Sequence, residues 1–66
     1  MFAKGDLVYV PQSAVLYGLS QNSICVNEKP FLGLFVNYED GGFVKVLLDG
    51  KQWLIKNREV YLSKGD

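Results

Sequence analysis

The dipeptide Asp49-Gly50 limits the possible folds of this 66-residue chain more than any other feature. It separates the runs 43–48 and 51–56, which are rich in aliphatic and aromatic side chains that favour β-strands. A two-residue loop of this composition favours a type I′ turn, in which both residues take a positive φ angle. The sequence therefore predicts a tight antiparallel hairpin, with residue 48 opposite residue 51 and residue 44 opposite residue 55.

The N-terminal part contains one expected strand and a long connection. Residues 7–10 form a short β-rich run, and Pro11 ends it because proline has no N–H to donate to a strand ladder. Residues 12–30 mix serine, asparagine, glycine and proline with apolar residues, so we expect a long loop, which in a small domain is often functional. The runs 15–17 and 24–26 are candidate arms of a loop that folds back on itself.

The remaining expected strands lie in the C-terminal part. Residues 31–38 are an apolar run of strand length, and residues 39–42 contain the glycines of a turn. Residues 57–59 are too few for an α-helix but sufficient for one 3₁₀ turn. Residues 60–62 then form a short final strand.

This order of elements predicts a single all-β domain over residues 1–66, a five-stranded SH3-like barrel. It has a long loop after strand 1 and one 3₁₀ turn before the last strand, as that fold does. An OB-fold also has five strands, but it usually places a helix between the third and fourth strands. Asp49-Gly50 leaves no room for such a helix, so the SH3-like barrel is preferred.

Three segments extend this prediction to a family: KGDLVYVPQ, KPFLGLFV and VLLDGKQWLIKNREVYL. Their arrangement resembles that of small, largely uncharacterised SH3-like proteins of tailed bacteriophages, including those of marine cyanobacteria. The resemblance covers about two thirds of the chain and omits residues 12–28. It implies a phage-encoded barrel without an assigned activity, and it transfers no catalytic residue.

Composition argues against several classes of function. The chain has no histidine, and its one cysteine, Cys25, has no partner for an internal disulfide. We therefore expect no enzyme, no metal site and no cofactor. Seven basic residues balance seven acidic ones, which removes the usual electrostatic signal for nucleic-acid binding. No segment has the ~20 apolar residues of a membrane span and none has the features of a signal peptide, so we expect a cytoplasmic protein.

The predicted pairing assigns each side chain to a face, because cross-strand partners share a face. The expected core contains Phe31, Gly33, Phe35, Val44, Val46, Leu48, Trp53 and Ile55. A hairpin through residues 40–41 is expected to place Tyr38 opposite Phe43 and Leu34 opposite Leu47. The outer side then carries an apolar patch, which is the predicted interface: Leu32, Leu34, Val36, Tyr38, Phe43, Leu47 and Leu54.

A soluble domain rarely exposes such a patch without a partner. Three explanations remain open. The loop at residues 12–28 folds over the patch with Val15, Leu16, Leu19 or Ile24; a second copy or a partner protein covers it; or a β-bulge shifts the register and reverses the assignment.

Two smaller groups of side chains are alternative sites. Tyr9, Tyr17 and Tyr61 are candidates for a peptide-binding groove between the long loop and the neighbouring strands. Lys45, Lys51, Lys56 and Arg58 are candidates for a basic strip that binds nucleic acid. The sequence thus favours a small protein–protein interaction or self-association module. A nucleic-acid-binding barrel and a structural virion component are the alternatives.

Overall fold

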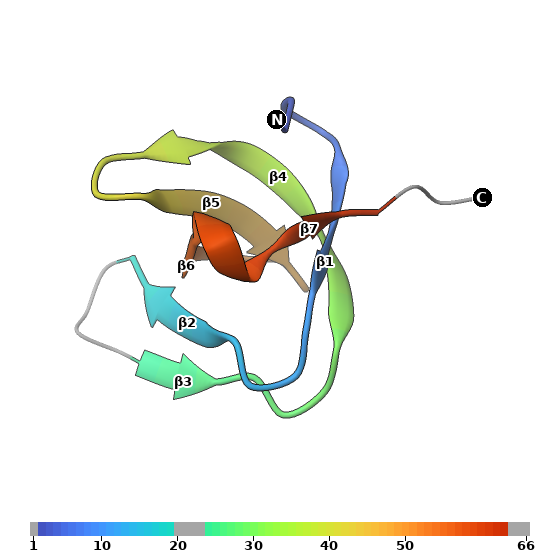
Figure 1. Cartoon of the computed structure of the whole chain (residues 1–66), viewed down its shortest axis with the longest axis vertical. Helices are drawn as coiled ribbons and strands as arrows, with labels where there is room; N and C mark the ends of the chain where they lie inside the picture. The colour runs from blue at the N-terminus through green and yellow to red at the C-terminus, as the bar shows by residue number, and fades with distance from the viewer. Residues whose placement is uncertain (1, 20–23, 64–66) are drawn as a thin grey trace.

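The structure is a computed structural model that describes residues 2–19 and 24–63 (Figure 1). Strands of one antiparallel sheet make up most of these residues, in the order β3-β2-β6-β5-β4-β1-β7. The sheet curls strongly, and β4 bends along its length (Figure 1). The elements are β1 (Leu7–Val10), β2 (Val15–Gly18), β3 (Ile24–Val26), β4 (Phe31–Glu39), β5 (Phe43–Leu48), β6 (Lys51–Lys56), a 3₁₀ turn (Asn57–Glu59) and β7 (Tyr61–Leu62).

The all-β class and the 3₁₀ turn before the last strand are confirmed, but the prediction of five strands is wrong. Residues 2–19 and 24–63 form seven strands, because the segment expected to be a long loop contains β2 and β3. These are the two predicted arms, and they pair with each other. In addition β2 pairs with β6, so the folded-back segment extends the sheet. None of the described helical turns is long and apolar enough to cross a membrane.

The β5–β6 hairpin has the predicted register. Leu48 lies opposite Lys51 and Val44 lies opposite Ile55. The turn residue Asp49 has a φ angle of 51° and Gly50 has a φ angle of 82°, as a type I′ turn requires. Local turn chemistry therefore determines which side chains of these two strands face the core.

The β4–β5 pairing departs from the prediction at one point. Leu34 lies opposite Leu47 as expected, but a β-bulge between Phe35 and Asn37 shifts the rest of the strand by one residue. Tyr38 then lies opposite Val44 instead of Phe43. Because one extra residue moves every later side chain to the other face, Tyr38 leaves the outer side. The bulge explanation is confirmed for this end of β4 only.

The core lies on the concave side of the curled sheet. Most of its predicted members are buried, and Phe31, Leu48 and Trp53 are partly buried against them. The long connection contributes two further buried apolar side chains, Ala14 and Leu16, which are not among the predicted core residues. The fully buried group is Val8, Val10, Val44, Val46 and Ile55.

Candidate interaction surface

The outer side of β1, β4, β5 and β7 carries two rows of apolar side chains. In one row Tyr9 lies between Tyr61 and Leu32. In the next row Leu34 lies between Leu7 and Leu47. Cross-strand partners share a face, so these side chains form one surface. We call it the leucine–tyrosine face, and its members are Leu7, Tyr9, Leu32, Leu34, Leu47 and Tyr61.

The leucine–tyrosine face is uncharged and largely exposed. Leu32 is 53% exposed and Leu34 is 41% exposed, and Leu7, Tyr9 and Tyr61 are exposed as well. Leu47 is partly buried. Single exposed leucines are ordinary, but six neighbouring apolar side chains on one surface are typical of a contact site.

Three of the seven predicted interface residues belong to this surface: Leu32, Leu34 and Leu47. Phe43 and Leu54 also lie on the outer side, but Tyr17 of β2 covers part of them. Tyr17 pairs with Leu54, and its ring meets the ring of Phe43 edge-on at a centroid distance of 5.3 Å. Val36 occupies the bulge.

Tyr38, a predicted interface residue, packs against the N-terminal segment instead. Its ring packs edge-on against Phe35 with centroids 4.9 Å apart, and it stacks with Phe2. The backbone N–H of Phe2 donates a 2.7 Å hydrogen bond to the Tyr38 hydroxyl. Tyr38 therefore fixes the N-terminal segment against the end of β4 and does not contribute to the leucine–tyrosine face.

The loop-cover explanation is only partly correct. Leu16 is buried in the core, while Leu19 and Ile24 are exposed. In the described residues the β2–β3 hairpin lies beside β6, and three strands (β6, β5 and β4) separate β2 from β1. The hairpin therefore shields the Phe43 side of the outer surface and leaves Leu32 and Leu34 uncovered.

The structure pairs two of the three tyrosines of the predicted peptide groove. Tyr9 and Tyr61 are cross-strand partners in β1 and β7. Tyr17 lies in β2, on the far side of β6, β5 and β4 in the strand order. Tyr9 and Tyr61 are therefore part of the leucine–tyrosine face, whereas Tyr17 packs against Phe43, and a groove formed by all three stays a prediction.

The four basic side chains do not form a continuous strip. Lys45 makes an ion pair with Glu39 at 3.5 Å, which offsets its charge. Lys51 lies beside the β5–β6 turn, at the opposite end of β6 from Lys56. Lys56 and Arg58 do lie together, around a hollow of about 460 Å³ that Gly41, Gly42 and Asn57 also line.

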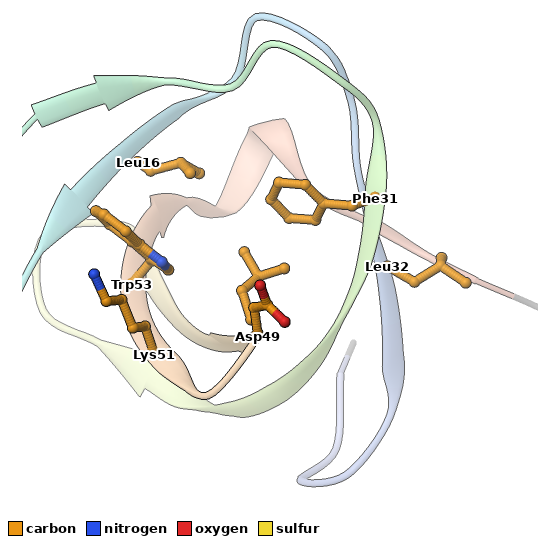
Figure 2. Close-up of a pocket in the computed structure, with 7 residues that line it drawn as sticks. Leu16, Phe31, Leu32, Asp49, Lys51 and Trp53 are labelled. Carbon is orange, nitrogen blue, oxygen red and sulfur yellow. The ribbon is translucent and has the colours of Figure 1, made fainter.

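A second hollow, of about 500 Å³, lies at the end of the curled sheet near the β5–β6 turn (Figure 2). Leu16, Phe31 and Trp53 point into it, and Asp49 and Lys51 stand at its rim, whereas Leu32 points to the other side of β4 (Figure 2). Its walls suit an apolar side chain. However, the core packing of Phe31 and Trp53 already accounts for their positions.

Leu7 and Phe2 also contribute to these surfaces, although neither is among the predicted site residues. Leu7 and Tyr9 alternate with the buried Val8 and Val10, and this period of two was a usable signal for an outer face on β1. Phe2 gave no comparable signal, because its contacts depend on the bulge in β4. Within the described residues, no three side chains among cysteine, aspartate and glutamate gather as metal ligands would.

Comparisons of this chain with known proteins found no match among family models, curated proteins or solved structures. The function must therefore be inferred from the geometry of the chain itself.

Proposed function

We propose that this chain is a small non-enzymatic protein–protein interaction module with an SH3-like barrel fold. The observation that carries the proposal is the exposed and uncharged leucine–tyrosine face on β1 and β4. A partner protein, or a second copy, would bury this face. The predicted origin in a tailed bacteriophage remains a prediction.

Three features support the barrel. The sheet curls around one core, and the β2–β3 hairpin occupies the position of the long loop after the first strand (Figure 1). The two-residue turn joins β5 to β6, and the 3₁₀ turn leads from β6 to β7. The final strand then pairs with the first, which is the arrangement expected of an SH3-like topology.

The size of the exposed face indicates a weak and reversible contact. Full burial of a leucine side chain is worth about 1.5 to 3 kcal/mol, and Leu32 and Leu34 are each about half exposed. Each therefore offers roughly 1 kcal/mol of further burial. Association also costs translational and rotational freedom, so a transient complex is expected.

Substitution of Leu34 by aspartate tests the proposal. A charge in the middle of the face should abolish partner binding and leave the fold intact, since the side chain lies outside the core. Gln12→Asp is the matched control, because Gln12 is exposed and lies in a turn away from the face. A partner captured by the wild-type chain should bind in purified form to wild type and to Gln12→Asp in calorimetry, but not to Leu34→Asp.

Two results would contradict the proposal. If Leu34→Asp loses the β-sheet circular dichroism signal, Leu34 is a core residue and the assigned register is wrong. If the purified partner binds all three proteins equally, the contact lies on another surface.

Binding of single-stranded nucleic acid has weaker support, because the ion pair of Lys45 and the distance of Lys51 along β6 break up the basic strip. Only Lys56 and Arg58 remain together. A fluorescent single-stranded oligonucleotide that shows no salt-dependent binding would remove this alternative.

A further inference from the structure

Strand β3 is one end of the sheet, and no strand among the described residues pairs with its far side. It consists of Ile24, Cys25 and Val26, which carry no charge. Ile24 is 65% exposed and Val26 is 57% exposed. Natural proteins usually protect such edges with a very short strand, lysine, proline or a bulge, because free backbone groups at an edge accept another strand. Neither a charge nor a proline lies within β3.

A hydrogen bond at the end of the β2–β3 pair shows which residues of β3 face the free edge. The N–H of Asn27 donates a 2.8 Å bond to the carbonyl oxygen of Ala14. Hydrogen-bonded pairs alternate along an antiparallel ladder, so the next such pair is Leu16 with Cys25. The backbone groups of Cys25 therefore point toward β2, and those of Ile24 and Val26 point away from it.

A contact on the other side of β2 agrees with this assignment. The N–H of Val15 donates a 3.2 Å bond to Oε1 of Glu59, which lies in the 3₁₀ turn and not in β3. Since backbone groups alternate in direction along a strand, those of Leu16 point toward β3. The N–H and C=O groups of Ile24 and Val26 are thus directed to the open edge.

We propose that two copies of this chain associate through β3, which pairs antiparallel with β3 of the second copy, centred on Cys25. In this register Ile24 of each copy lies opposite Val26 of the other, and each such pair exchanges both of its backbone hydrogen bonds. The symmetry is two-fold, because the same three residues form both halves of the contact.

The side chains are complementary in the same register. Ile24 and Val26 share the outer face with Tyr17 and Val15, their partners in β2. In the pair of strands they would form an apolar cluster of four branched side chains, with no charge to desolvate. A second copy suits this edge, because the same uncharged three-residue strand supplies hydrogen bonds and apolar packing to both halves of the contact.

The same register would bring the two Cys25 side chains close together. Cys25 would face its counterpart as a non-hydrogen-bonded pair, in which Cα atoms are about 4.5 Å apart. This separation falls within the range that a disulfide spans, about 4.4 to 6.8 Å. With glutathione disulfide as the oxidant, one thiolate forms a mixed disulfide and releases one glutathione. The second thiolate then displaces the other glutathione, so two electrons pass from the two cysteines to glutathione disulfide, which is released as two reduced glutathione molecules.

Amide hydrogen exchange, measured residue by residue by NMR, tests the direction of the backbone groups. Exchange at Ile24 and Val26 should slow as the protein concentration rises and the dimer forms. Exchange at Cys25 should be slow at every concentration, because its N–H already bonds within the β2–β3 pair. The opposite pattern, or no concentration dependence, would overturn the proposal.

A disulfide trap tests the register independently. Wild-type protein in glutathione disulfide should form a covalent dimer about tenfold or more faster than the double variant Cys25→Ser/Gln12→Cys, because pairing raises the effective concentration of the two thiols. Equal rates in the two proteins would refute the antiparallel register centred on Cys25.

Sedimentation distinguishes this contact from the leucine–tyrosine face. Ile24→Lys should give a monomer at concentrations where the wild type is dimeric, and Leu62→Lys, on the opposite edge strand β7, should remain dimeric. If Leu34→Asp abolishes the dimer and Ile24→Lys does not, the β3 proposal fails while the proposed function stands. If the wild type is monomeric throughout, the β3 proposal also fails.

Discussion

Substitution of Gly33 by alanine should destabilise the protein, although alanine is usually tolerated better than glycine in a strand. Gly33 is buried in β4, opposite Val8 of β1. A Cβ atom built at this position would lie 2.6 Å from Cγ1 of Val46, 3.1 Å from the carbonyl oxygen of Leu47 and 3.4 Å from Cγ of Leu48. The first distance is far inside van der Waals contact, and Val46 is 0% exposed, so its side chain cannot move aside into solvent.

Two opposing effects determine how much Gly33→Ala lowers the free energy of unfolding. Overpacking a core typically costs about 1 to 3 kcal/mol. Replacing glycine by alanine restricts the unfolded chain and returns about 0.4 to 1 kcal/mol. Because the closest contact is so short, the upper part of the overpacking range applies, and the expected net loss is about 1.5 to 2 kcal/mol. A chain of this length has a total stability of about 3 to 10 kcal/mol, so the change is easily measured.

A double-mutant cycle with Val46→Ala identifies the cause. Val46→Ala alone removes buried methyl groups and should cost about 2 kcal/mol. In that background the atom at 2.6 Å is gone, and Gly33→Ala should then cost less than about 0.5 kcal/mol. Urea denaturation followed by tryptophan fluorescence gives all four free energies of unfolding, since Trp53 is the one tryptophan.

If the two substitutions are additive, the cost of Gly33→Ala does not arise from Val46. If Gly33→Ala is as stable as the wild type, β4 and β5 do not approach as closely as the structure shows. Gln12→Ala, at an exposed turn position, serves as the neutral control.

Three smaller effects follow from single contacts and can be measured in the same urea assay. Gly50→Ala should cost about 1 to 2 kcal/mol, because φ at this position is 82°, and equal stability would refute the strain. Glu59→Ala should cost about 1 kcal/mol through loss of the acceptor for the Val15 N–H, whereas Glu59→Gln, which keeps an acceptor, should cost less; equal losses would contradict this role. Tyr38→Phe should cost about 0.5 kcal/mol and increase exchange of the Phe2 amide, and unchanged exchange would argue against that hydrogen bond.

The parts of the fold that depend on local chemistry were predictable from the sequence. The Asp49-Gly50 turn sets the register of β5 and β6, and that register correctly placed Val44, Val46 and Ile55 in the core. The same alternation between faces correctly placed Leu34 and Leu47 opposite each other on the outer side. A period of two and one well-defined turn are enough for this result, because neither depends on distant contacts.

The features of the fold that were not predicted have no such local signal in the sequence. The bulge near Val36 has no local signature, since no glycine or proline marks it, and it alone moved Tyr38 to the Phe2 side. The β2–β3 hairpin was recognised only as two arms, because its place beside β6 depends on contacts between residues far apart in the sequence. For the same reason the sequence does not indicate that Tyr17 pairs with Leu54 and packs against Phe43.

The two proposed contacts lie in different parts of the sheet, and this has a testable consequence for binding strength. β3 ends the sheet on one side, whereas β1 and β4, which carry most of the leucine–tyrosine face, lie toward the other. A dimer formed through β3 would therefore present two copies of the face. Each copy is weak alone, but two linked sites can raise the overall affinity by about 10² to 10⁴ when the partner is also repeated.

Affinity per site and avidity can be measured separately. Ile24→Lys should bind a purified partner in solution as well as the wild type, because the leucine–tyrosine face is unchanged. On a densely immobilised partner it should dissociate faster than the wild type, since it has lost the second site. Leu34→Asp should lose binding in both formats. If Ile24→Lys and the wild type dissociate at the same rate from the dense surface, the dimer contributes nothing to partner binding, and the two contacts act independently.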